Sequence, residues 1–351
     1  MKPVTGSQSS SIHPRIMRPM IVSASRATDI PAWYGDWFID RLQNGWVDWI
    51  NPFNGKTHRV DLHGVRAVVF WSKNPEPFIR HLDTLDRIVP AYYFHFTVND
   101  YEADNLEPHL PPLADRIRTF RALARRLGTH RVIWRTDPLL VSDNLTVEQL
   151  ATRIRRIGDS LYPYTERQVF SFIRIQAYAK VKRTIARYAA RIREVDNVER
   201  RELMGILAEY AANWGWPLTG CAEPESTEIP GISTGRCIDD ALLVRMETGH
   251  EFRAEYRWNM IDGIPVRTGP PRKDPGQRRE CTCVISKDIG RYNTCPHFCR
   301  YCYAVRTMHT DALNPIDASG IGSNRTGLGT AWFGNPEDAD EKAGNSEGRA
   351  L

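Results

Sequence analysis

Short apolar runs alternate with amphipathic segments over roughly the first two thirds of the chain. The apolar runs predict six strands, at residues 20–25, 65–71, 92–98, 131–135, 168–175 and 217–221. Apolar residues spaced three and four apart predict helices between and after them, at 33–44, 75–82, 113–127, 147–161, 181–195 and 201–213. Gly45 and Gly128 are placed to end two of these helices. Thr146 and Gln149 form a predicted capping box at the start of another.

This alternation predicts an α/β protein built on a parallel sheet, because strands joined by helical crossovers pair in parallel. Six such units suit a partial TIM-like barrel of (βα) repeats, and the same period also suits an open doubly wound sheet. After residue 221 the regular pattern fades. We predict a flexible N-terminus, a barrel-like domain, a cysteine-rich metal-binding segment packed on that barrel and a disordered tail, at residues 1–19, 20–221, 222–309 and 310–351.

Composition places the chain among ordinary globular proteins. Hydrophobic residues make up 41% and charged residues 25% of its 351 residues. The first 18 residues lack the apolar core of a signal peptide, and no stretch approaches the length of a membrane span. We therefore predict a cytoplasmic protein without a membrane partner. No glycine-rich nucleotide fingerprint follows any predicted strand, which argues against a dinucleotide dehydrogenase or an ATPase.

Charge is unevenly distributed along the sequence. Residues 113–201 contain twenty lysines and arginines against nine acidic residues. Such a basic stripe could follow the phosphates of a nucleic acid. The arginines fall between apolar positions at helical spacing, however, so we favour the alternative that they cover the solvent faces of helices.

All seven cysteines lie between residues 221 and 302, and the last three form one short loop. The loop reads Cys295-Pro-His-Phe-Cys299-Arg-Tyr301-Cys302, a C-x3-C-x2-C spacing. Three thiolates this close together can hold three irons of a 4Fe–4S cluster and leave the fourth iron open for a ligand. The alternative is a zinc ion with His297 as its fourth ligand. Closed zinc sites usually join cysteine pairs from separate turns, so the spacing favours iron.

The other cysteines are Cys221, Cys237, Cys281 and Cys283. Four thiols are the number needed for a closed tetrahedral zinc site or a fully ligated cluster. If they form a second metal site, their sulfurs should lie within about 4 Å of one another. The alternative is that Cys221 or Cys237 is a small buried apolar residue.

Polar side chains follow several predicted strands at their carboxyl ends, where parallel α/β folds bind ligands. Arg26 and Asp29 follow the first strand, Lys73 follows the second, and Arg135 and Asp137 end the fourth. The cations suit a carboxylate or a phosphate, and the carboxylates suit ribose hydroxyls or an amino group. We predict that these residues bind a cofactor, although each could instead belong to a structural ion pair or a surface turn.

Three more polar residues are candidates at the same edge of the sheet. His95 lies on the third strand between two phenylalanines, Arg174 lies on the fifth, and the sixth runs into Glu223. For His95 the alternative is a core histidine that contacts no ligand.

The three-cysteine loop resembles the cluster loop of the radical S-adenosylmethionine (radical SAM) enzymes, C-x3-C-x-aromatic-C. The matching residues are Cys295, Cys299, Tyr301 and Cys302. In that superfamily the loop normally follows the first barrel strand, whereas here it lies about fifty residues from the C-terminus. The whole chain resembles an uncharacterised bacterial family that carries such a cluster at its C-terminal end. The segments that carry this wider likeness are 25–31, 70–75 and 286–290.

The resemblance implies a 4Fe–4S cluster that binds S-adenosylmethionine and generates a 5′-deoxyadenosyl radical, which takes hydrogen from a substrate. It also implies a reductant such as ferredoxin or flavodoxin, and places Tyr301 beside the adenine or over the cluster. For this chemistry the late loop must fold back to the strand ends. Two alternatives remain: a zinc- or cluster-stabilised protein that binds nucleic acid, and an electron-transfer iron–sulfur protein without S-adenosylmethionine chemistry.

Overall fold

The computed structural model describes residues 15–186, 191–246 and 248–305. All of them fall within one compact unit, Met1–Ile316. The predicted tail 310–351 and most of the predicted N-terminal arm lie outside the described residues.

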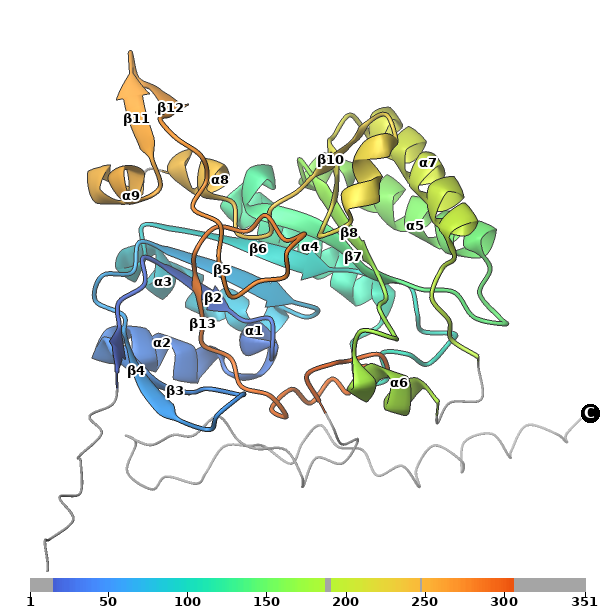
Figure 1. Cartoon of the computed structure of the whole chain (residues 1–351), viewed down its shortest axis with the longest axis horizontal. Coiled ribbons are helices and arrows are strands. Elements are labelled where there is room, and N and C mark those ends of the chain that lie inside the picture. Colours follow the sequence, from blue (N-terminus) through green and yellow to red (C-terminus); the bar gives the residue numbers. More distant parts are fainter. Residues whose placement is uncertain (1–14, 187–190, 247, 306–351) are drawn as a thin grey trace, which may run out of the picture. The chain divides into compact units, whose positions relative to one another are not determined.

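An eight-stranded parallel sheet forms the centre of the fold (Figure 1). Its strands lie in the order β10-β9-β8-β7-β6-β5-β2-β13, and every neighbouring pair is parallel. Their bounds are β2 Ile21–Ala24, β5 Ala67–Ser72, β6 Ala91–Thr97, β7 Val132–Leu139, β8 Gln168–Phe172, β9 Leu218–Gly220, β10 Ile232–Thr234 and β13 Lys287–Asp288. The predicted parallel α/β sheet is confirmed. Among the described strands β10 and β13 are not paired, so this sheet is not a closed barrel.

The long helices connect the central strands along the chain. Their bounds are α1 Ile30–Trp33, α2 Gly35–Asn44, α3 Leu82–Ile88, α4 Leu113–Leu127, α5 Val147–Leu161, α6 Ala179–Ile185 and α7 Asn197–Trp214. The capping box predicted at Thr146 is present at the start of α5. Gly45 ends α2 with a φ of 78°, a left-handed conformation that glycine adopts without strain.

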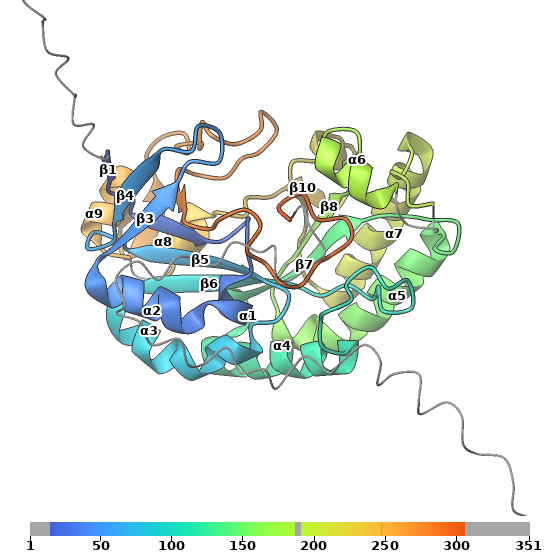
Figure 2. The same ribbon diagram turned by 90° about the horizontal axis from the view of Figure 1, so that it is seen from below.

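Alternate residues of the strands face two separate cores, because successive side chains point to opposite faces of a sheet. Val68, Phe70 and Phe94 pack with the apolar faces of α2, α4, α5 and α7 in the larger core. Ala67 and Val69, on the other face, pack against the segment that follows β10. That segment includes α8 (Asp240–Val244) and α9 (His250–Glu255). Figure 2 shows the two sets of helices on opposite sides of the sheet.

Several elements differ from the sequence prediction. The predicted helix 75–82 is a 3₁₀ helix, Glu76–His81, that leads into α3. β8 ends at Phe172, and α6 ends at Ile185 just before the undescribed residues 187–190. Further short 3₁₀ helices span Thr129–Arg131, Tyr162–Tyr164 and Pro224–Glu228.

The sequence analysis predicted neither of two small sheets. β1 (Ile16–Met17), β4 (Thr57–Asp61) and β3 (Trp46–Ile50) form one, so the predicted flexible arm in fact contributes a strand. β11 (Trp258–Ile261) and β12 (Ile264–Arg267) form an antiparallel hairpin. These strands are short and half-exposed, and their apolar periodicity is correspondingly weak.

Candidate functional site

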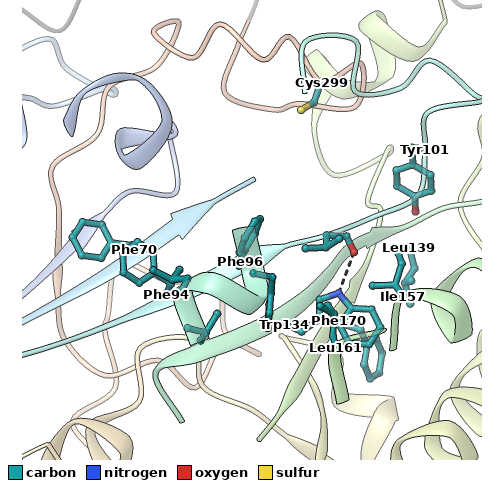
Figure 3. Close-up of a cluster of buried hydrophobic side chains, with 14 of the residues drawn as sticks. Phe70, Phe94, Phe96, Tyr101, Trp134, Leu139, Ile157, Leu161, Phe170 and Cys299 are labelled. Atoms are coloured by element: carbon teal, nitrogen blue, oxygen red, sulfur yellow. Dashed lines mark hydrogen bonds between the residues drawn. The ribbon is translucent and has the colours of Figure 1, made fainter. Parts of the chain in front are cut away.

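The three-cysteine loop lies across the carboxyl ends of the central strands. The Arg300 amide donates to the Leu106 carbonyl at 2.9 Å, after β6. The Tyr303 hydroxyl donates to the Arg26 carbonyl at 2.6 Å, after β2. Figure 3 shows Cys299 on this loop, at the border of the buried cluster that includes Phe96 and Phe170. The loop therefore folds back to the strand ends, as the radical SAM resemblance requires.

The three thiols of this loop are close enough to interact with one another. The Cys302 amide donates to the Cys299 carbonyl at 2.9 Å, which closes a tight turn between the two residues. Burial, together with the nearby Asp29 and Cys302, raises the pKa of Cys295 to about 12. Backbone amides also reach the sulfurs: the Ala304 amide donates to Cys302 Sγ at 3.3 Å.

A buried carboxylate, Glu107, anchors the loop. It accepts a hydrogen bond from the Tyr301 hydroxyl and one from Lys73 Nζ at 2.7 Å. Arg116 Nη1 lies 3.6 Å from its second oxygen, and Asn99 Nδ2 donates to the first at 3.2 Å. Burial alone would raise the pKa of Glu107, but Lys73 and Arg116 outweigh it and hold the pKa below its usual value. Sequence reasoning missed Glu107 and Arg116, because no motif marks them.

Asp29 holds the loop from the other side. Its Oδ2 accepts from the Lys73 amide at 2.7 Å and faces His297 Nε2 at 2.9 Å. Its Oδ1 caps α1 by accepting from the Ala32 amide at 3.1 Å. Both oxygens therefore have partners within the protein, and the predicted ribose contact of Asp29 stays a prediction.

Lys73 lies between these two anchors, as a candidate residue at the end of β5. Its ammonium group also lies 3.4 Å from the Asp137 carbonyl and 5.4 Å from the centroid of the Tyr301 ring. Burial would lower the pKa of Lys73, but Glu107 and then Cys299 raise it above its usual value. A permanent cation thus lies beside the Cys299 sulfur.

The other predicted cofactor residues lie near the remaining cysteines. Arg135 donates from Nη2 to Asp137 Oδ2 at 2.8 Å and from Nη1 to Cys237 Sγ at 2.9 Å. Arg26 covers the Trp71 ring at 4.8 Å. The structure thus divides the predicted set, with Asp29, Lys73 and Tyr301 at the loop and Arg135 and Asp137 toward the second cysteine group. Arg26 lies between the two, since it contacts Tyr303 and its charge acts on Cys283 and Cys237.

The further strand-end candidates have structural partners. His95 is fully buried, stacks on Trp71 at 5.2 Å and places Nε2 2.7 Å from the Cys237 carbonyl. This matches the core-histidine alternative. Arg174 forms an ion pair with buried Glu223 at 3.2 Å.

Some polar atoms at the strand ends are buried without a hydrogen-bond partner. They are Arg26 Nη2, Thr28 Oγ1, Glu107 Oε2 and His297 Nδ1. Buried polar groups are normally paired, so a polar ligand at the strand ends could satisfy some of these atoms.

Some arginines of the basic stretch 113–201 bind acidic or carbonyl groups of the same molecule. Arg126 pairs with Asp83 and Asp86, and Arg153 donates to the Asp100 carbonyl at 2.8 Å. These contacts match the alternative of arginines on helix surfaces.

Within residues 15–305 as described, no group of three or more His, Cys, Asp or Glu side chains is arranged to hold a metal ion as it stands. In the same part of the chain no helix is long and apolar enough to span a bilayer.

Comparisons with known proteins identify the family without naming an activity. No curated protein matches the sequence. One similar solved structure is a putative alpha-L-fucosidase from Bacteroides thetaiotaomicron, 12% identical, with 71% of this chain and 88% of that chain covered at a TM-score of 0.25. The family model for a domain of unknown function, DUF1848, matches residues 21–304. The chain therefore belongs to the DUF1848 family.

Proposed function

We propose that this protein is an iron–sulfur enzyme of the radical SAM type. The observation that supports it is the position of the three thiols, in one turn across the carboxyl ends of a parallel sheet. When bound there, a 4Fe–4S cluster with S-adenosylmethionine supplies a 5′-deoxyadenosyl radical. The protein's own residues bind, orient and shield these groups.

Cys295, Cys299 and Cys302 are the residues that would hold the cluster. Burial raises the pKa of all three thiols, so they are protonated without metal, and a bound metal would have to displace these protons. Lys73 stabilises the resulting negative charge beside Cys299. Amide donors such as that of Ala304 favour the thiolate form and tune the potential of a bound cluster. Glu107 and Tyr301 fix the loop against the sheet.

Arg26 and Thr28 are the residues best suited to receive S-adenosylmethionine. Arg26 Nη2 and Thr28 Oγ1 are buried without partners, and both follow the strand that the loop covers. A guanidinium donor suits a carboxylate, and a hydroxyl suits a ribose or an amino group. Arg135 and Asp137, which pair with each other, orient groups at the same edge.

The sheet itself fits the proposed class as a partial TIM-like barrel. β13 lies beside β2, where a closed barrel places its last strand beside its first. We also propose a cytoplasmic location, because all seven described cysteines are free and reducing conditions keep thiols available for metal. Ferredoxin or flavodoxin would then supply the electron.

A second candidate is a zinc site in the same loop. Asp29 faces His297 Nε2 and leaves His297 Nδ1 buried without a partner. A carboxylate on one ring nitrogen is the usual partner of a histidine that binds zinc through the other. Three cysteines and His297 would complete a tetrahedral zinc site.

Metal analysis after anaerobic reconstitution separates the two candidates. The proposed function predicts iron and sulfide in the wild type. In a Cys295→Ala, Cys299→Ala, Cys302→Ala variant, the content of each should be lower by the amount in one cluster. His297→Ala serves as the matched variant, since only the zinc site needs its ring as a ligand. Equal iron in wild type and triple variant, with zinc lost in His297→Ala, would reject the iron–sulfur assignment.

A further inference from the structure

The four cysteines outside the loop come from opposite edges of the sheet. Cys221 follows β9 and Cys237 follows β10, at one edge. Cys281 and Cys283 precede β13, the strand at the other edge. A contact between the two groups therefore bridges the open sheet, where a barrel would be closed by strand pairing.

Backbone contacts bring the two groups together. The Thr282 hydroxyl donates to the Gly235 carbonyl at 2.8 Å, and the Val284 amide donates to the Ile238 carbonyl at 3.2 Å. Between them, the Ile238 amide donates to Cys283 Sγ at 3.3 Å. The segment 282–284 thus runs beside 235–238 and places the Cys283 thiol next to that of Cys237.

Two of the four thiols are in direct contact, since Cys221 Sγ lies 3.1 Å from Cys237 Sγ. The other two are near enough to shift thiol pKa values, because Cys283 influences the pKa of both Cys237 and Cys281. All four are free, and three are at most 8% exposed. The Cys221–Cys237 contact agrees with the predicted convergence, and the convergence of all four sulfurs around one point stays a prediction.

We propose that Cys221, Cys237, Cys281 and Cys283 bind one zinc ion, which ties the two edges of the sheet together. Sulfurs around a tetrahedral zinc lie about 3.8 Å apart, since each zinc–sulfur bond is about 2.3 Å. The Cys221–Cys237 separation of 3.1 Å is shorter than this spacing, so the two sulfurs would move slightly apart around an ion. The ligand sulfurs of a cubane cluster bind outward-facing irons and lie farther apart still, so the short separation favours a single ion.

The surroundings suit sulfurs that carry negative charge. Arg135 Nη1 and the Ile238 amide donate to Cys237 and Cys283, respectively, as second-sphere donors do to metal-bound thiolates. Ordinary buried cysteines act as small apolar residues and need no such donors. Zinc here would stabilise the fold directly, because the unfolded chain has no preformed site.

Zinc content and coordination in the Cys295→Ala, Cys299→Ala, Cys302→Ala variant test this inference, because that variant keeps all four proposed ligands. We expect about one zinc per chain, with an X-ray absorption spectrum that fits four sulfur ligands at about 2.3 Å. In Cys237→Ser, Cys283→Ser, zinc should fall to a small fraction and the melting temperature should drop. If the Cys237→Ser, Cys283→Ser variant does not fold, the X-ray absorption spectrum of the triple variant still shows whether four sulfurs bind zinc.

Zinc bound through nitrogen or oxygen, iron in its place, no metal, or a Cys221–Cys237 disulfide in the triple variant would each overturn the zinc site. The result is independent of the proposed function. A wild type that holds zinc on four sulfurs but no iron would reject the radical SAM assignment and leave this site standing.

Discussion

At the scale of single residues, Glu107 explains why the cysteine loop has a defined place. Its carboxylate joins Tyr301 of the loop, Lys73 after β5 and Arg116 of α4. Tyr301, at the aromatic position of the motif, therefore holds the loop through its hydroxyl group as well as packing with its ring. Sequence reasoning found Tyr301 and Lys73 from the motif and the strand ends. Glu107 lies in a loop without periodicity, so only the folded chain reveals it.

Replacing Glu107 with glutamine should destabilise the protein by about 3 kcal/mol at pH 7, because removing one partner leaves buried cations uncompensated. Urea denaturation of the two metal-free proteins measures this. Asp36→Asn is the control, since Asp36 pairs with Arg80 at the exposed surface and its loss should cost less than about 1 kcal/mol. Similar losses in the two variants would contradict the role given to Glu107.

The same pair of proteins should respond differently to pH. The folded state lowers the pKa of Glu107, so its contribution to stability is present above the unfolded pKa of about 4.3 and is lost as pH falls below it. The advantage of wild type over Glu107→Gln should therefore be full near neutrality and shrink in acid. Denaturation at several pH values would show this, and an advantage that grows in acid would refute the assignment.

Gly45 sets the turn between α2 and β3. Its φ is +78°, and an added Cβ would lie 2.1 Å from His63 Cε1. Gly45→Ala should cost about 1–2 kcal/mol from backbone strain, because His63 is largely exposed and its ring can move. Gly64→Ala has open space and no such φ, so it should be close to neutral in the same thermal unfolding experiment. Equal effects would show that backbone conformation is not the cause.

At the scale of secondary-structure elements, the spacing of apolar residues correctly predicted the helices that bury a regular apolar face. Helices α4 and α5 have the predicted bounds, and both have apolar faces against the sheet. The strands that escaped prediction are short: β13 has two residues and β10 has three. Such strands are defined by their partners in space, which the local pattern does not contain.

Thr146 caps α5 by accepting from the Gln149 amide. Thr146→Ala should lower stability by about 1 kcal/mol, the usual cost of losing an N-cap. Thr152→Ala, at an exposed position of the same helix, should be neutral or slightly stabilising because alanine is the better helix former. Chemical denaturation measures the free energy of unfolding of both variants. A Thr152→Ala protein less stable than Thr146→Ala would contradict the capping account.

At the scale of the whole molecule, the C-terminal segment is tied to the first central strand. Asp288 accepts from the Ser23 hydroxyl and the Arg26 amide, each at 2.8 Å. Gly290 lies so close to Ser25 that a Cβ would come within 1.7 Å of the Ser25 hydroxyl. Two of the segments that carry the family likeness, 25–31 and 286–290, therefore meet in space. The sequence marked both segments, but their contact arises only through the parallel pairing of β13 with β2.

Asp288→Ala should loosen this tie and speed amide hydrogen exchange in residues 287–305, because hydrogen bonds to a charged carboxylate contribute about 1.5–3 kcal/mol. Glu280→Ala, an exposed acidic residue in the same segment, is the matched control. Hydrogen exchange followed by mass spectrometry resolves the peptides. Unchanged protection of the loop in Asp288→Ala would mean that β13 does not hold it in place.

We propose that the loop holds a cluster with an iron open to S-adenosylmethionine. The most direct test is the electron paramagnetic resonance spectrum of the anaerobically reconstituted, dithionite-reduced protein, recorded with and without S-adenosylmethionine. We expect a 4Fe–4S signal that changes when S-adenosylmethionine is added and that is absent from the Cys295, Cys299 and Cys302 triple alanine variant. Formation of 5′-deoxyadenosine should accompany it. A reduced cluster whose spectrum ignores S-adenosylmethionine, with no nucleoside formed, would contradict it and indicate electron transfer instead.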